Sequence, residues 1–171
     1  MYKYLSILYI LLACSLQGCL SDEPKGTALK PGDSLPFFGV ELSDGKIVSN
    51  ASLVGKVGVI VFFNTDCPDC QKELPVIQKL WDELKDDFQI VIAPIAREEN
   101  AQHIASYWSK NNMTMPYSPQ ESRAIYNLFA SSAIPRIFIS NPDGVITFAS
   151  DDTDMPSLDD LKNAINLALN N

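Results

Sequence analysis

Residues 57–70 read VGVIVFFNTDCPDC and combine an apolar run with two closely spaced cysteines. The first part of this stretch, Val57–Asn64, is a continuous run of apolar, β-branched and aromatic side chains that ends in one asparagine. Such a run is typical of a strand that is buried on both faces of a sheet. Apolar residues then recur at helical spacing over Pro68–Asp86. The motif Cys67-Pro68-Asp69-Cys70 therefore falls where a buried strand gives way to a helix.

The segments around this stretch complete an α/β pattern. Phe88–Ile95 predicts a second buried strand, and helices are expected over Glu98–Asn111, Glu121–Ala130 and Pro156–Leu169. Two turn sequences predict hairpins, with strands at Phe37–Leu42 and Lys46–Ser49 and at Ile137–Ser140 and Val145–Ala149. Buried strands that alternate with helices, followed by an antiparallel pair, predict a central mixed sheet with helices on both faces and an N-terminal β-hairpin extension.

Length and composition limit the function. The 171 residues suit one domain, and the 46% apolar content is ordinary for a globular protein. The chain is acidic, with 13 Lys and Arg against 21 Asp and Glu. This balance argues against a nucleic-acid partner, which requires a basic face.

The N-terminus has the pattern of an export signal. Lys3 precedes the apolar run Leu5–Ala13, whose length is that of a signal-peptide core. The sequence Leu16-Gln17-Gly18-Cys19 resembles the lipobox of bacterial lipoproteins. That resemblance implies a signal peptide at 1–18 and lipidation of Cys19. The polar residues after it predict a flexible tether over 19–31, and a globular domain is expected over 32–171. The alternative is a plain secretory signal with an incidental cysteine.

Two cysteines then remain for chemistry, Cys67 and Cys70. The N–H groups and the dipole at the start of a helix stabilise a thiolate, which is the reactive form of cysteine, and Pro68 suits the first helical position. Cys67 is expected to attack a disulfide, and Cys70, one turn further on, to resolve the mixed disulfide. A structural zinc site is disfavoured because His103 is the sole histidine to join them, and a structural disulfide would close a very small loop.

The segment Phe62–Pro75 resembles the active-site region of thioredoxin-fold proteins, in particular the TlpA/ResA-like branch of exported thiol–disulfide oxidoreductases. The resemblance implies a thioredoxin-like domain over 32–171. It further implies that Glu73 is a proton acceptor near the thiols and that Pro75 kinks the helix. It also implies that Ile134-Pro135 is a cis-proline loop whose Ile134 backbone pairs with a substrate strand.

The sequence departs from the family pattern at several positions. Asp66 replaces a common tryptophan, Val61 stands where cytosolic thioredoxins have a buried acid, and residues 131–133 lack the usual glycine. Asp66, Asp69 and Glu73 surround the cysteines, and their charge disfavours a second anion. We therefore expect a reductase-leaning potential, with Asp66, Pro68 and Asp69 tuning the site.

The sequence thus predicts a lipid-anchored enzyme of the bacterial cell envelope that reduces or isomerises disulfides of exported proteins, with its catalytic domain in the periplasm or, alternatively, at the cell surface. A membrane-bound electron donor, attachment to the lipid membrane through Cys19 and a monomeric state are expected, without cofactor or metal. One alternative is a peroxiredoxin-like peroxidase, although Thr65 lies two residues before Cys67 rather than three. Another is a redox-inactive or metal-chaperone module, for which His103 is poorly placed. Arg136 is expected to contact either substrate or solvent.

Overall fold

The structure is a computed structural model that describes residues 28–171. Its central sheet has the strand order β4-β3-β5-β6. Strand β3 (Val57–Phe63) pairs in parallel with β4 (Ile90–Ala96) and antiparallel with β5 (Arg136–Ser140), which pairs antiparallel with β6 (Ile146–Ser150). A separate antiparallel hairpin joins β1 (Gly39–Glu41) to β2 (Ile47–Ser49). The predicted mixed α/β architecture with a hairpin extension is confirmed.

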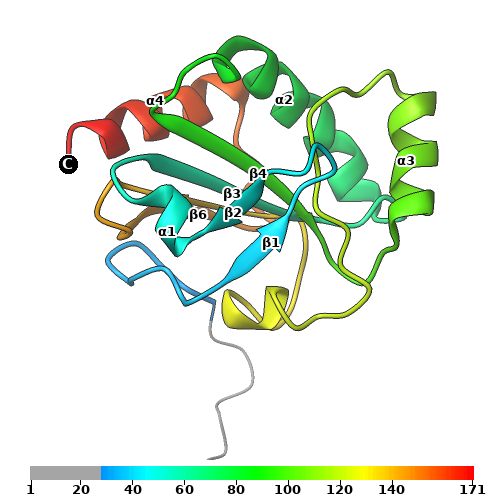
Figure 1. The fold of residues 1–171 in the computed structure, drawn as a ribbon, viewed down its shortest axis with the longest axis horizontal. Coiled ribbons are helices and arrows are strands. Elements are labelled where there is room, and N and C mark those ends of the chain that lie inside the picture. Colours follow the sequence, from blue (N-terminus) through cyan, green and yellow to red (C-terminus); the bar gives the residue numbers. More distant parts are fainter. Residues whose placement is uncertain (1–27) are drawn as a thin grey trace, which may run out of the picture.

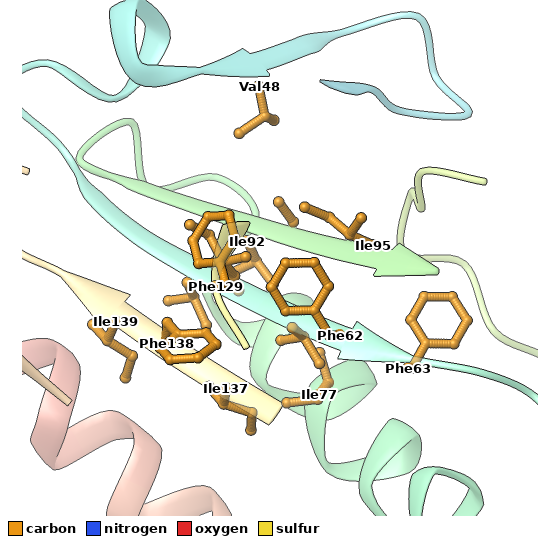
Figure 2. Close-up of a cluster of buried hydrophobic side chains, with 14 of the residues drawn as sticks. Val48, Phe62, Phe63, Ile77, Ile92, Ile95, Phe129, Ile137, Phe138 and Ile139 are labelled. Atoms are coloured by element: carbon orange, nitrogen blue, oxygen red, sulfur yellow. The ribbon is translucent and has the colours of Figure 1, made fainter. Parts of the chain in front are cut away.

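Both faces of the sheet are covered. Helices α2 (Pro68–Leu84) and α4 (Leu158–Leu169) pack together on one face, while α3 (Ala101–Lys110) lies to one side (Figure 1). The short helix α1 (Asn50–Leu53) follows the hairpin. Figure 2 shows Val48 of the hairpin and Ile77 of α2 on opposite sides of the sheet. All seven residues of β3 are buried because the strand is central and covered on both sides.

An aromatic cluster fixes the end of β3. The ring of Phe62 lies 5.0 Å from that of Phe129, 5.3 Å from that of Tyr126 and 6.3 Å from that of Phe138, measured between centroids. Phe62 and Phe138 are fully buried, and Figure 2 shows them with Phe129 in the core. The strand that leads to the cysteines is therefore held by close packing of large side chains.

The prediction of a helix over Glu121–Ala130 is wrong. The structure has only the 3₁₀ turn η1 (Tyr126–Leu128) there. The N–H groups of Phe129 and Ala130 both donate to the Tyr126 carbonyl. Tyr126 and Phe129 lie three residues apart, so the 3₁₀ turn places both rings on its buried side.

The packed domain begins earlier than the predicted boundary at Gly32. Ala28 and Leu29 pack against the core, and the Leu29 N–H donates to the Phe129 carbonyl at 2.9 Å. The predicted signal peptide, Cys19 and most of the predicted tether lie outside the described residues. Within residues 28–171, no helix is both long and apolar enough to span a membrane.

Candidate active site

Cys67 lies at the start of α2, where it is the N-cap residue and Pro68 occupies the first turn. Its Sγ accepts a hydrogen bond from the Cys70 N–H at 3.4 Å. Cys67 is half-buried and Cys70 is fully buried, and both are free thiols. A thiolate at Cys67 would be stabilised by this N–H and by the positive end of the helix dipole, and it could still meet a partner.

Cys70, in contrast to Cys67, lies where its thiolate is disfavoured. Burial raises the pKa of the Cys70 thiol strongly, and the hydrogen bond with Cys67 raises it further, whereas the positive charge of Arg97 works in the opposite direction. Cys70 therefore keeps its proton at neutral pH. It suits a resolving thiol that reacts only after a group nearby takes that proton.

Glu73 lies one helical turn beyond Cys70 and is 3% exposed. Its Oε1 has no hydrogen-bond partner among the described residues. Burial raises the pKa of Glu73 to about 7, so this carboxyl changes charge near neutral pH. Pro75 lies within the same helix, where it cannot donate a hydrogen bond to the Gln71 carbonyl.

The loop before β5 faces the reactive thiol. The Ile134–Pro135 peptide bond is cis, as the resemblance implies. The Cys67 Sγ–H donates to the Ile134 carbonyl, with 3.6 Å between sulfur and oxygen. Residues that are 67 positions apart in the chain thus form one site.

The acidic surround is weaker than the sequence predicts. The Asp69 carboxylate pairs with the Lys72 ammonium at 2.8 Å. The Asp66 carboxylate lies 3.7 Å from Nε2 of His103 and is 78% exposed, so water screens it. Glu73 is uncharged below about pH 7. The structure therefore weakens the charge argument for a reductase-leaning potential.

A buried hydrogen-bond network next to the site was not predicted. The Glu99 carboxylate accepts hydrogen bonds from the Thr65 N–H, at 2.8 Å, and from the Thr65 hydroxyl, and it lies 3.0 Å from Nδ1 of His103. Glu99 is 4% exposed. Strands β3 and β4 are parallel, so the residues after Phe63 and after Ala96 meet at one edge of the sheet. Polar residues shortly after both predicted strands were the signal for this network.

A sequence model of the AhpC/TSA family matches residues 31–149, which is most of the chain. The chain belongs to the AhpC/TSA family. This AhpC/TSA protein is 24% identical over 120 residues to the thiol-disulfide oxidoreductase ResA of Bacillus subtilis, a match that covers 70% of this chain and 66% of the relative, or just under two thirds of its length. It is 25% identical over 130 residues to ResA of Bacillus thuringiensis, covering 76% and 73% of the two chains.

Solved structures give the same fold for this AhpC/TSA protein. A proposed protein disulfide isomerase from Bacteroides thetaiotaomicron has a TM-score of 0.77 and 27% identity, with 86% of this chain and 94% of that chain covered. A thiol:disulfide interchange protein of the thioredoxin family from Chlorobium tepidum has a TM-score of 0.68 and 23% identity, with 84% and 99% covered. These comparisons confirm the predicted family and fold, and the named relatives agree with the predicted enzyme class, thiol–disulfide oxidoreductase.

Proposed function

We propose that this protein is a thiol–disulfide oxidoreductase that reduces or isomerises disulfides of exported proteins through Cys67 and Cys70. The supporting observation is the pairing of a half-buried thiol at a helix N-terminus with a fully buried second thiol one turn on. Only the first sulfur can meet a protein disulfide, and only the second is positioned to complete the exchange.

The reaction proceeds in two exchanges. The Cys67 thiolate attacks one sulfur of the substrate disulfide, a bond forms between the two sulfurs, and the other substrate sulfur leaves as a thiolate that takes up a proton. Cys70 then loses its proton and attacks Sγ of Cys67, which releases the second substrate thiol. Two electrons have moved to the substrate, and the enzyme holds a Cys67–Cys70 disulfide.

Glu73 is the proposed proton acceptor for Cys70. The Cys70 thiol is buried among apolar residues, so water reaches it poorly. Glu73 lies on the same buried side of α2, and its unpartnered Oε1 is free to receive a proton. A carboxyl whose pKa is about 7 is half ionised near neutral pH and can both take up and release a proton there.

The cis-proline loop is the proposed substrate-binding element. The Ile134 carbonyl accepts a hydrogen bond from the Cys67 thiol, so a substrate strand that pairs with the Ile134 backbone would lie beside the reacting sulfur. Pro135 has no N–H and therefore ends this pairing after one residue.

We further propose that the catalytic domain acts in the bacterial cell envelope, held by a lipid on Cys19. The basis is the sequence pattern of the N-terminus, with its apolar run and lipobox-like segment. Because each turnover leaves a disulfide in the enzyme, a membrane-bound dithiol donor is needed to restore it. Neither step requires a cofactor.

The test is to trap substrates with Cys70→Ala, because this variant stops the reaction at the mixed disulfide on Cys67. Expressed in the source bacterium, it is expected to accumulate protein adducts that a thiol reductant releases. The matched control, Cys67→Ala with Cys70→Ala, should accumulate none. Equal amounts of adduct with both variants, or none with either, would refute the proposal.

The peroxidase alternative has less support from the geometry. The Thr65 hydroxyl donates to the Glu99 carboxylate and is therefore occupied away from the thiol. A Cys70→Ser variant that consumed hydrogen peroxide with repeated turnover would favour the peroxidase. For the metal-chaperone alternative, no group of three or more His, Cys, Asp or Glu side chains within residues 28–171 is arranged to hold a metal ion.

A further inference from the structure

All three arginines of the sequence bind the same loop, residues 131–134, although the chain also has ten lysines. Nη2 of Arg123 donates to the Ser131 carbonyl at 3.0 Å, and Nη1 of Arg97 donates to the Ser132 carbonyl at 2.9 Å. Nη2 of Arg136 lies 3.4 Å from the Ser132 hydroxyl oxygen. The guanidinium groups therefore gather at the loop that ends in the cis-proline.

Tyr126 connects two of these arginines. The guanidinium carbons of Arg97 and Arg123 lie over its ring, 5.1 Å and 5.3 Å from the centroid. The Tyr126 hydroxyl donates to the Ala133 carbonyl at 2.6 Å, and the residue is 1% exposed. A desolvated aromatic ring attracts a cation more strongly than an exposed one does. The stack thus holds both arginines in position to donate to the loop.

As a result, four consecutive carbonyls of the loop each accept a hydrogen bond from a side chain. Arg123, Arg97 and Tyr126 supply the donors for residues 131, 132 and 133. Cys67 supplies the donor for Ile134. The loop lies outside the strands, so side-chain donors satisfy the carbonyls that strand pairing would satisfy within a sheet. Ile134 is the one residue of the four whose carbonyl is held by the reactive thiol itself.

Arg97 also binds the segment that leads from β3 to Cys67. Its backbone N–H donates to the Phe63 carbonyl at 2.8 Å, and its carbonyl accepts from Nδ2 of Asn64 at 3.0 Å. These two residues end β3 and begin the turn to Cys67. Its side chain reaches the loop before Pro135 and is only 18% exposed. One residue therefore spans the gap between the cysteine motif and the substrate-binding loop.

We propose that Arg97, Tyr126 and Arg123 are positioning residues that fix the loop 131–134, so that the Ile134 backbone faces Cys67 and is the part of the loop presented to a substrate strand. This inference rests on the proposed function, because it concerns how that site binds its substrate. Lysine cannot replace these arginines, since its ammonium lacks the planar group that stacks on a ring while it donates to a carbonyl.

The loop's fixed geometry should act on substrate binding rather than on the intrinsic reactivity of the thiol. Cys67 is the N-cap residue of α2, and within the described residues the side chains of Arg97, Arg123 and Tyr126 donate to the loop and not to α2. A small alkylating reagent needs no strand pairing and therefore reports on the thiol alone. A protein disulfide such as that of insulin needs both the thiol and the loop.

The test compares Arg97→Lys, Arg97→Met and Tyr126→Phe with the wild-type protein, and uses Lys46→Met, a surface charge change on the hairpin, as the matched control. Three quantities are measured: kcat and KM for insulin reduction, the rate at which iodoacetamide alkylates Cys67, and hydrogen–deuterium exchange of the amides of residues 131–134. Arg97→Lys keeps the positive charge and Tyr126→Phe keeps the aromatic ring. These two variants therefore test the inference if Arg97→Met does not fold.

The expected result for Arg97→Met is a KM about tenfold higher, the size expected from one lost charge-assisted hydrogen bond, with the alkylation rate of Cys67 within about twofold of wild type. A lower kcat is also expected for this variant, because the positive charge of Arg97 favours the Cys70 thiolate, whereas Tyr126→Phe keeps that charge and should leave kcat within about twofold of wild type. Loop amides should exchange roughly tenfold faster. Arg97→Lys and Tyr126→Phe should show smaller changes of the same kind, and Lys46→Met none.

Two results would overturn the inference. One is folded Arg97→Met whose loop amides exchange at the wild-type rate and whose KM is that of wild type. The other is Arg97→Lys with the wild-type KM and the wild-type exchange rate. If wild-type protein reduces no disulfide, the proposed function fails. The exchange measurement still decides in that case whether these residues fix the loop.

Discussion

The buried carboxyl of Glu73 makes protein stability depend on pH in a predictable direction. Its pKa is about 7 in the folded protein, against an ordinary value of 4.5. The unfolded chain therefore loses this proton at a lower pH than the folded protein does. Below about pH 4 both states hold the proton, and between the two pKa values only the folded state holds it. Stability attributable to Glu73 is thus present at low pH and is lost as the pH rises through about 7.

The magnitude follows from the difference of roughly 2.5 pH units between the two pKa values. Each unit corresponds to about 1.4 kcal/mol, so the ionised carboxylate lowers the free energy of unfolding by about 3 kcal/mol at high pH. The side chain is almost completely buried, so screening by water reduces this little. Glu73→Gln keeps the shape of the side chain and cannot ionise, so the variant should lack this pH dependence.

Urea denaturation of reduced wild-type protein and of Glu73→Gln, at about pH 4 and about pH 8, measures the effect. The stability difference between the two proteins should shift by about 3 kcal/mol in favour of the variant as the pH rises. Glu41→Gln, on an exposed position of β1, should show no such shift. A difference between wild type and Glu73→Gln that stays the same at both pH values would refute the argument from burial.

Three further substitutions test single contacts that stabilise the fold. Thr65→Val removes the hydroxyl that donates to buried Glu99, and it should lower the free energy of unfolding by about 1–3 kcal/mol in urea denaturation; an unchanged value would mean that the carboxylate finds another donor. Phe62→Ala removes a fully buried ring below the cysteine motif, so a loss of about 3–5 kcal/mol is expected by the same method, and a loss below about 1 kcal/mol would contradict the packing described. Ser157→Ala removes the N-cap of α4 and should cost about 1 kcal/mol, seen as a lower thermal midpoint, whereas Ser157→Gly should cost only a few tenths.

Much of the fold could be predicted because its signals are local. The unbroken apolar run of β3 and the helical spacing of α2 follow directly from residues that are neighbours in the chain. The two hairpins follow from turn sequences that need no tertiary contact. The helix predicted over Glu121–Ala130 is wrong because its apolar pattern covers only a few residues. The structure of this segment depends on the burial of Tyr126 and Phe129, which the local sequence does not encode.

The candidate site divides in the same way. Cys67, Cys70 and Glu73 lie on one short segment, and their spacing places them on one helix. The contribution of Arg97 depends on which strands are neighbours and on where a loop 35 residues further along the chain returns, and that of Tyr126 depends on how the same loop folds back onto its ring. The residues proposed to react could therefore be predicted from the sequence, whereas those that hold the loop opposite them could not.

The position of Leu29 has a consequence for where this enzyme can work. Leu29 bonds to Phe129, so the chain joins the packed domain close to the loop that carries Ile134. An extended chain covers at most about 3.3–3.6 Å per residue, so the nine residues from Cys19 to Ala28 reach roughly 30 Å. A lipid on Cys19 would then confine the domain to a thin layer above the membrane surface. Substrates would be limited to proteins whose disulfides come within that layer. The short tether would also keep the active site close to an electron donor embedded in the same membrane.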